Sequence, residues 1–140
     1  MDRPAEDRPA SASKIDELTE KMSASQVERA RRICMALPEA FEQEAWGEPT
    51  WRVRKRMFAM FANNHHSDGH VALWLPAPLG VQEMLVREDA RMFFVPPYVG
   101  VKGWVGVDLD AAADDAEVAE LVAQAYCMVA PKKLAAQVGG

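Results

Sequence analysis

The residues best suited to chemistry are long cationic side chains, gathered in one short stretch and again toward the C-terminus: Arg52, Arg54, Lys55, Arg56, Lys102, Lys132 and Lys133. Such side chains on an exposed turn can reach phosphate oxygens of a nucleic acid. Trp51 precedes the first four and could stack on a base or sugar. If the fold brings all seven cations to one face, they form a basic patch on an acidic protein.

Residues 52–56 also have a simpler interpretation, as a solvated hairpin tip whose charges deter pairing with another sheet edge. Alternation along a strand would place Arg52 and Arg54 on one face and Val53 on the other, which suits one basic face and one core face. Both interpretations remain open from the sequence.

Aromatic side chains indicate a second possible site. Trp46, Tyr98 and Trp104 could line a groove for a small molecule or a protein partner, with Pro96 and Pro97 as rigid apolar walls. Residues of these types more often cap a hydrophobic core. The groove is therefore the alternative to nucleic-acid binding.

Metal and catalytic motifs are weak or missing. His65, His66, Asp68 and His70 fall in one predicted turn and offer ligands for zinc, copper or nickel. Neither cysteine lies nearby to complete a structural zinc site, and a polar turn explains the cluster, so we predict no metal. There is no nucleophile elbow, glycine-rich phosphate loop or catalytic carboxylate pair. We therefore expect a non-enzymatic protein without a cofactor.

Composition bounds the class of protein. The chain has 140 residues, a net charge of −5, a pI of about 5.2 and 49% hydrophobic residues, enough for one core. The acidic balance is the main physical objection to DNA binding. Cys34 and Cys127 fit apolar helical patterns, so we expect buried thiols rather than a disulfide. With no apolar span of membrane length and no signal peptide, we expect a cytoplasmic protein, monomeric and without a membrane partner.

Residues 1–22 mix Pro, Ala, Ser and charges, which predicts a disordered leader before one domain over residues 23–140. The predicted elements of the domain are a helix from Ser25 to Leu37, extended chain over Phe41–Trp51 with a turn at Gly47-Glu48-Pro49, a hairpin of Trp51–Val53 and Met57–Phe61 around Arg54-Lys55-Arg56, a strand at Val71–Leu75, a short helix at Val81–Leu85, paired strands at Met92–Val95 and Gly103–Val107, a helix from Asp114 and Asp115, and a helical turn at Pro131–Val138. This order predicts an α+β fold, an antiparallel sheet packed against N- and C-terminal helices.

Three ordered signatures carry a family resemblance. They are Leu37-Pro38 with Glu44–Val53 and Lys55–Ala59, then Phe93–Tyr98 with Gly103–Val107, then Val129–Leu134. Together they resemble the MmcQ/YjbR family across about Ser25 to Ala136. The resemblance implies a CyaY-like fold and double-stranded DNA binding through a double wing of hairpins.

A CyaY-like fold also invites comparison with frataxins, which bind iron through acidic residues on the first helix. The first helix here instead carries Arg29, Arg31 and Arg32, and the acidic stretch runs from Asp108 to Glu120. Helix capping and solubility explain that stretch, so we do not expect an iron site.

Overall fold

The fold comes from a computed structural model that describes residues 24–63, 71–111 and 114–139. Its elements are a helix over residues 24–35, β1 (Phe41–Ala45), β2 (Glu48–Val53), β3 (Arg56–Asn63), β4 (Val71–Leu75), α3 (Val81–Glu88), β5 (Phe93–Phe94), the 3-10 helix η2 (Val99–Lys102), β6 (Val105–Asp108), α4 (Asp115–Val129) and α5 (Lys132–Gly139). The predicted leader and the histidine turn lie outside the described residues.

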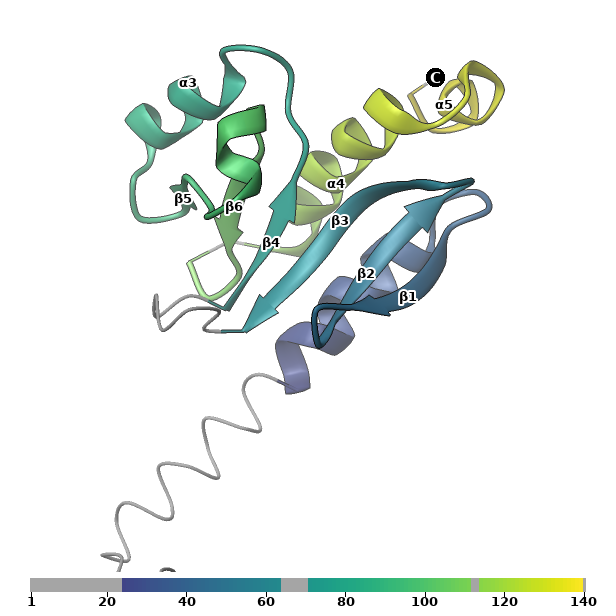
Figure 1. The fold of residues 1–140 in the computed structure, drawn as a ribbon, viewed down its shortest axis with the longest axis horizontal. Helices are drawn as coiled ribbons and strands as arrows, with labels where there is room; N and C mark the ends of the chain where they lie inside the picture. Colours follow the sequence, from purple (N-terminus) through teal and green to yellow (C-terminus); the bar gives the residue numbers. More distant parts are fainter. Residues whose placement is uncertain (1–23, 64–70, 112–113, 140) are drawn as a thin grey trace, which may run out of the picture.

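The six strands form one sheet in the order β1-β2-β3-β4-β6-β5, and every neighbouring pair is antiparallel. The helix over residues 24–35 and α4 lie behind this sheet in Figure 1, on the same face. The predicted α+β class, with an antiparallel sheet against N- and C-terminal helices, is confirmed.

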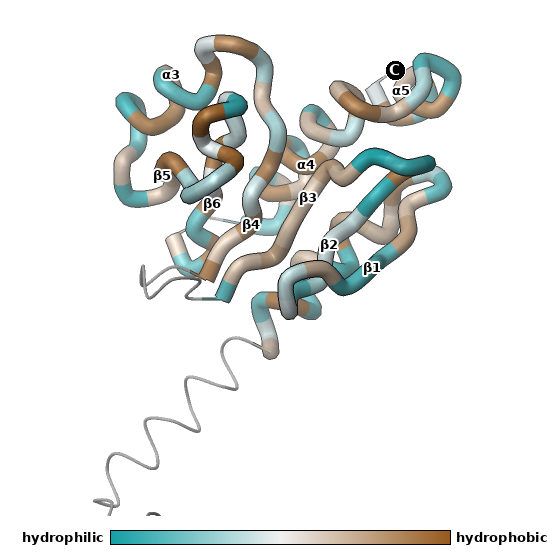
Figure 2. Tube along the Cα trace, in the orientation of Figure 1, coloured by the Kyte–Doolittle hydropathy of each residue, from teal (hydrophilic) through white to brown (hydrophobic). Residues whose placement is uncertain are grey.

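Strand alternation divides the buried side chains between two clusters. On β4, Leu73 and Leu75 point into the main core against the helices, whereas Ala72 and Trp74 point to the opposite face, called here the outer face. No long helix of the described chain covers the outer face; instead Met57, Phe94, Val99 and Trp104 pack against it. The segment from β5 to β6 therefore covers part of the outer face, as a layer of helices would. Figure 2 shows the apolar middle of the sheet and the hydrophilic start of β3.

The helices contribute small and aromatic side chains to the main core. Ala30 and Cys34 of the first helix are fully buried, and Tyr126 of α4 meets Phe58 edge-on with ring centroids 5.2 Å apart. Burial raises the pKa of the Cys34 thiol far above its ordinary value. Both cysteines are free thiols as predicted, but Cys127 is half-buried rather than buried.

Most local predictions are confirmed, with shifts at turns. The strand at Val71–Leu75 has the predicted bounds, and the helix predicted at Val81–Leu85 extends to Glu88. The first turn lies at Trp46-Gly47 rather than Gly47-Glu48-Pro49, because both residues adopt the left-handed φ values, 55° and 78°, that a tight hairpin turn requires. Within the described residues, no helix is long and apolar enough to cross a membrane.

Candidate nucleic-acid interface

The basic hairpin forms as predicted, but its four cations have different surroundings. Arg54 and Lys55 form the turn between β2 and β3, and Arg56 begins β3. Arg54 adopts a left-handed φ of 57° and donates from Nε to Glu39 Oε1 at 2.8 Å. This hydrogen bond raises the pKa of Arg54. Arg54 is thus paired with an acid. Because it lies in the turn, it does not share a strand face with Arg52 as the alternation predicted.

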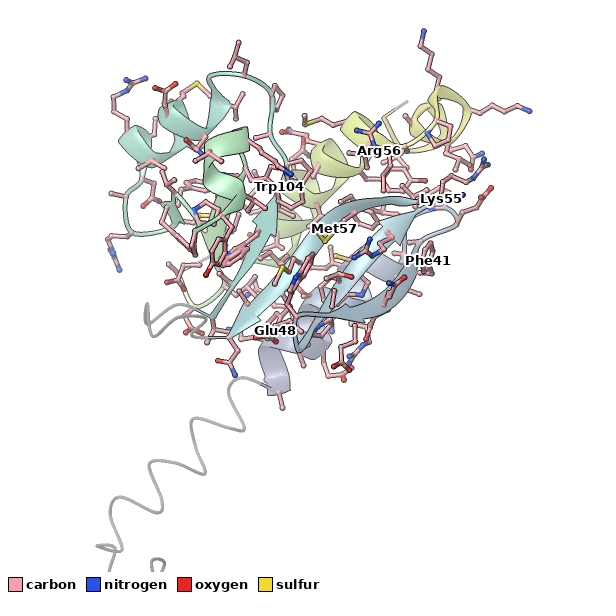
Figure 3. All side chains as sticks on the ribbon, viewed as in Figure 1. Phe41, Glu48, Lys55, Arg56, Met57 and Trp104 are labelled. Carbon is pink, nitrogen blue, oxygen red and sulfur yellow. The ribbon has the colours of Figure 1, made fainter. Side chains whose placement is uncertain are left out.

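Arg52 lies on the outer face of β2 rather than at the tip. Its side chain is half-buried beside Phe41, its partner in register on β1, and its Nε donates to Thr50 Oγ1 at 3.1 Å. The remaining hairpin cations, Lys55 and Arg56, are exposed and form no ion pair with any residue of the described ranges. Figure 3 shows both at the β2–β3 tip, with Glu48 at the opposite end of β2. They are the hairpin charges available to a partner.

The prediction that Trp51 stacks on a base is wrong, because the side chain is buried. Its side chain is 0% exposed, and its indole Nε1 donates to Glu42 Oε1 at 3.0 Å. Arg31 of the first helix holds the same carboxylate at 2.7 Å, and its hydrogen bond lowers the pKa of Glu42. Because Arg52 faces outward, alternation turns Trp51 inward with Val53. The Trp51 side chain belongs to the core.

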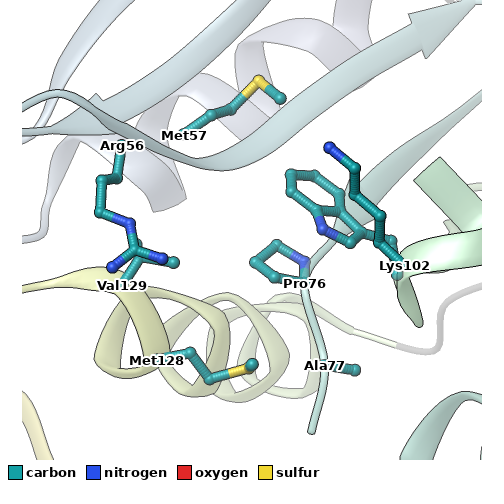
Figure 4. Close-up of a pocket in the computed structure, with 8 residues that line it drawn as sticks. Arg56, Met57, Pro76, Ala77, Lys102, Met128 and Val129 are labelled. Atoms are coloured by element: carbon teal, nitrogen blue, oxygen red, sulfur yellow. The ribbon is translucent and has the colours of Figure 1, made fainter. Parts of the chain in front are cut away.

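A cleft opens beside the hairpin tip (Figure 4), with a volume of about 360 Å³. The segments that line it come from the start of β3, the end of β4, the η2 segment and the end of α4: Arg56, Met57, Pro76, Ala77, Lys102, Trp104, Met128 and Val129. Figure 4 shows Arg56 and Lys102 on opposite sides of the cleft. Neither forms an ion pair with a described residue. The fold thus brings two of the predicted cations together.

The predicted aromatic groove does not assemble as a set. Trp104 lines the cleft, but Trp46 and Tyr98 do not. Trp46 is 68% exposed at the turn after β1, an edge strand separated from β6 by three other strands. Four strand spacings amount to about 19 Å, so Trp46 is too far away to share a groove with Trp104. Tyr98 is 69% exposed just before η2.

The C-terminal lysines lie next to the cleft along the chain. Lys132 and Lys133 are exposed in the first turn of α5, three and four residues after Val129, and Leu134 anchors that helix in the core. Neither lysine lines the cleft. They are exposed cations outside the cleft.

The arginines of the first helix pair with acids away from this region. Arg29 and Arg32 of the first helix both bond to Asp115, at 2.6 and 2.7 Å, and these bonds lower the pKa of Asp115. Asp114 caps α4 by accepting from the Glu117 backbone N–H at 2.9 Å. Across the described ranges, no three His, Cys, Asp or Glu side chains gather as metal ligands. Part of the acidic stretch therefore has a structural explanation.

Comparison with known proteins places the chain in a family. The family model described as YjbR matches residues 35–128, about two thirds of the chain. The chain belongs to the YjbR family. No curated protein matches this YjbR-family chain. A crystal structure of the Deinococcus radiodurans protein DR2400, with the domain DUF419, is 22% identical, covers 81% of this chain and 87% of its own, and has a TM-score of 0.64. That likeness shows a shared fold.

The YjbR match contains the hairpin tip, Lys102, Trp104 and Met128 but ends before Lys132 and Lys133. The cleft is therefore built mainly from the part of the chain that the family model spans. Met57, Pro76 and Met128 are not recognisable as site residues from the sequence, because their side chains carry no chemical signal until tertiary contacts place them around one cavity.

Proposed function

We propose that this YjbR-family protein is a non-enzymatic DNA-binding protein that contacts duplex phosphates without reading the sequence. The proposed contacts are the exposed cations of the hairpin tip, the cleft and α5: Lys55, Arg56, Lys102, Lys132 and Lys133. The observation that carries the proposal is the meeting of Arg56 and Lys102 at one cleft, where no acid of the described residues pairs with either. Arg54 is omitted because Glu39 pairs with it, and Trp51 because it is buried.

The net charge of −5 describes the whole chain, whereas the proposal rests on a local group of cations. Glu42 and Asp115 bond to arginines of the first helix, and no described acid pairs with Lys55 or Arg56 at the tip. Phosphate contacts make affinity depend on salt with a logarithmic slope of about −0.9 per contact. Five contacts would weaken binding about 500-fold between roughly 50 and 200 mM salt. A small basic surface on an acidic protein therefore predicts modest, salt-sensitive affinity.

The test is fluorescence anisotropy of a labelled random-sequence duplex across a salt series. The test variant is Lys55→Glu/Arg56→Glu. The control is Arg87→Glu/Arg91→Glu, which makes the same change in net charge at two exposed residues beside α3. We expect the test variant to lose at least about tenfold in affinity, and the control to lose no more than about threefold through the general field. Absence of wild-type binding at low salt, or equal losses in both variants, would overturn the proposal.

A further inference from the structure

We propose that the cleft between Arg56 and Lys102 is a binding site for a nucleoside monophosphate, a soluble ligand distinct from DNA. The cleft combines two cations with an indole, two thioethers and a proline ring. This inference goes beyond phosphate-backbone contacts, since it holds whether or not duplex DNA binds to the surrounding surface.

Charge indicates the anionic end of the ligand. Arg56 and Lys102 approach the cleft from opposite sides, and neither is neutralised by a described acid. A phosphate monoester carries about −1.5 to −2 charges near neutral pH and several strong acceptor oxygens, which matches one guanidinium and one ammonium. A monocarboxylate carries one negative charge and would therefore balance the charge of only one of the two cations.

Volume and lining indicate the remainder of the ligand. The cleft measures about 360 Å³, within the range of about 300 to 1,000 Å³ usual for small-molecule sites. Inorganic phosphate alone would leave most of that space to water. Trp104 is half-buried and offers an aromatic surface on which a base can stack. Met57 and Met128 add adaptable apolar walls around a planar base.

The wall that carries Lys102 and Trp104 is fixed before any ligand arrives. Gln82 of α3 donates from its side-chain amide to two backbone oxygens, those of Gly100, at 2.9 Å, and Trp104. Between Lys102 and Trp104, Gly103 takes a left-handed φ of 91°, a conformation that a side chain would strain. The Trp104 backbone N–H also donates to Val99 O at 3.3 Å. These contacts hold the backbone that carries Lys102 and Trp104, which lowers the entropy cost of ordering this wall on binding.

Two variants separate this site from the proposed DNA surface. Met128→Trp fills the cleft without changing the charge, because Met128 lines the cavity and is 43% exposed. We expect it to abolish nucleotide binding and to leave duplex affinity within about threefold, since it removes no phosphate contact. Lys132→Gln/Lys133→Gln removes charges outside the cleft, so it should weaken duplex binding and leave nucleotide binding unchanged.

The experiment is isothermal titration calorimetry of the full chain with AMP, GMP, CMP and UMP, and with adenosine and inorganic phosphate for comparison. We expect at least one monophosphate to bind about tenfold or more tightly than adenosine and phosphate, because only it engages both the cations and the indole. Arg56→Gln and Lys102→Gln should each weaken it about tenfold, whereas the control Arg87→Gln should not. Thermal melts followed by circular dichroism establish that each variant is folded.

Two outcomes would overturn the inference. The first is that no monophosphate binds more tightly than inorganic phosphate. The second is that Met128→Trp binds the monophosphate as well as wild type does. Loss of duplex binding alone would count against the DNA proposal and leave this one standing. Because both proposed ligands would contact Arg56 and Lys102, a bound monophosphate should compete with duplex DNA.

Discussion

Replacing Trp51 with phenylalanine tests the finding that this residue supports the core rather than contacting nucleic acid. The side chain is 0% exposed and its indole donates to Glu42 at 3.0 Å. Losing a hydrogen bond to a charged acceptor costs about 1.5–3 kcal/mol. The smaller ring leaves part of the indole volume empty, which costs about 1–2 kcal/mol more. Because Arg31 still holds Glu42, the carboxylate keeps a partner, and we expect a total loss of about 2–4 kcal/mol.

The assay is urea unfolding followed by far-ultraviolet circular dichroism, which does not depend on the fluorescence of the removed indole. Trp46→Phe is the matched control, because Trp46 is 68% exposed and its replacement should change the free energy of unfolding by less than about 0.5 kcal/mol. Under native conditions, duplex affinity of Trp51→Phe should stay within about twofold of wild type.

A Trp51→Phe protein with unchanged stability and weakened DNA binding would refute the reasoning, since it would mean that the indole reaches the ligand. If Trp51→Phe fails to fold, Glu42→Gln provides a milder change. It keeps an oxygen acceptor for the indole but removes the charge paired with Arg31. We expect it to lose about 1 kcal/mol, because the pair is partly exposed to solvent, and to bind DNA as wild type does.

Two further predictions concern packing and pH. Gly106→Ala should destabilise the protein by about 1–3 kcal/mol in urea unfolding, because the new Cβ would lie 2.4 Å from the Phe94 ring, and most of this cost should disappear in a Phe94→Ala background. Undiminished cost in the double mutant would contradict the packing argument. The hydrogen bond from Arg31 lowers the pKa of Glu42 below its ordinary 4.5, so its contribution to stability is present above pH 4.5 and is lost as pH falls through the folded-state value. As the pH is lowered from 4.5, the free energy of unfolding of Glu42→Gln should therefore fall less than that of wild type. Equal falls in the two proteins would contradict this.

Local patterns were enough to predict most of the elements. The strand at Val71–Leu75 is a short apolar run closed by proline, and α4 begins beside Asp114, whose side chain caps it. Such signals depend on neighbours a few residues apart, so they survive without tertiary contacts. The η2 helix was not predicted, because the contact that supports it, from the Gln82 side chain in α3 to the Gly100 backbone oxygen, comes from another element of the fold.

The candidate site was likewise predicted in part from the sequence and decided in part by the tertiary structure. Sequence alone located a cationic hairpin, the lysines that follow α4 and the family resemblance, because charge, turn residues and ordered motifs can be recognised along one dimension. Only the tertiary structure paired Arg54 with Glu39 and turned Trp51 into the core. It also brought Arg56 and Lys102, 46 positions apart, to one cleft with Trp104 and Met128. Burial, ion pairing and cavities depend on which distant segments meet, and that follows from the packing of the sheet and helices rather than from the spacing of residues along the chain.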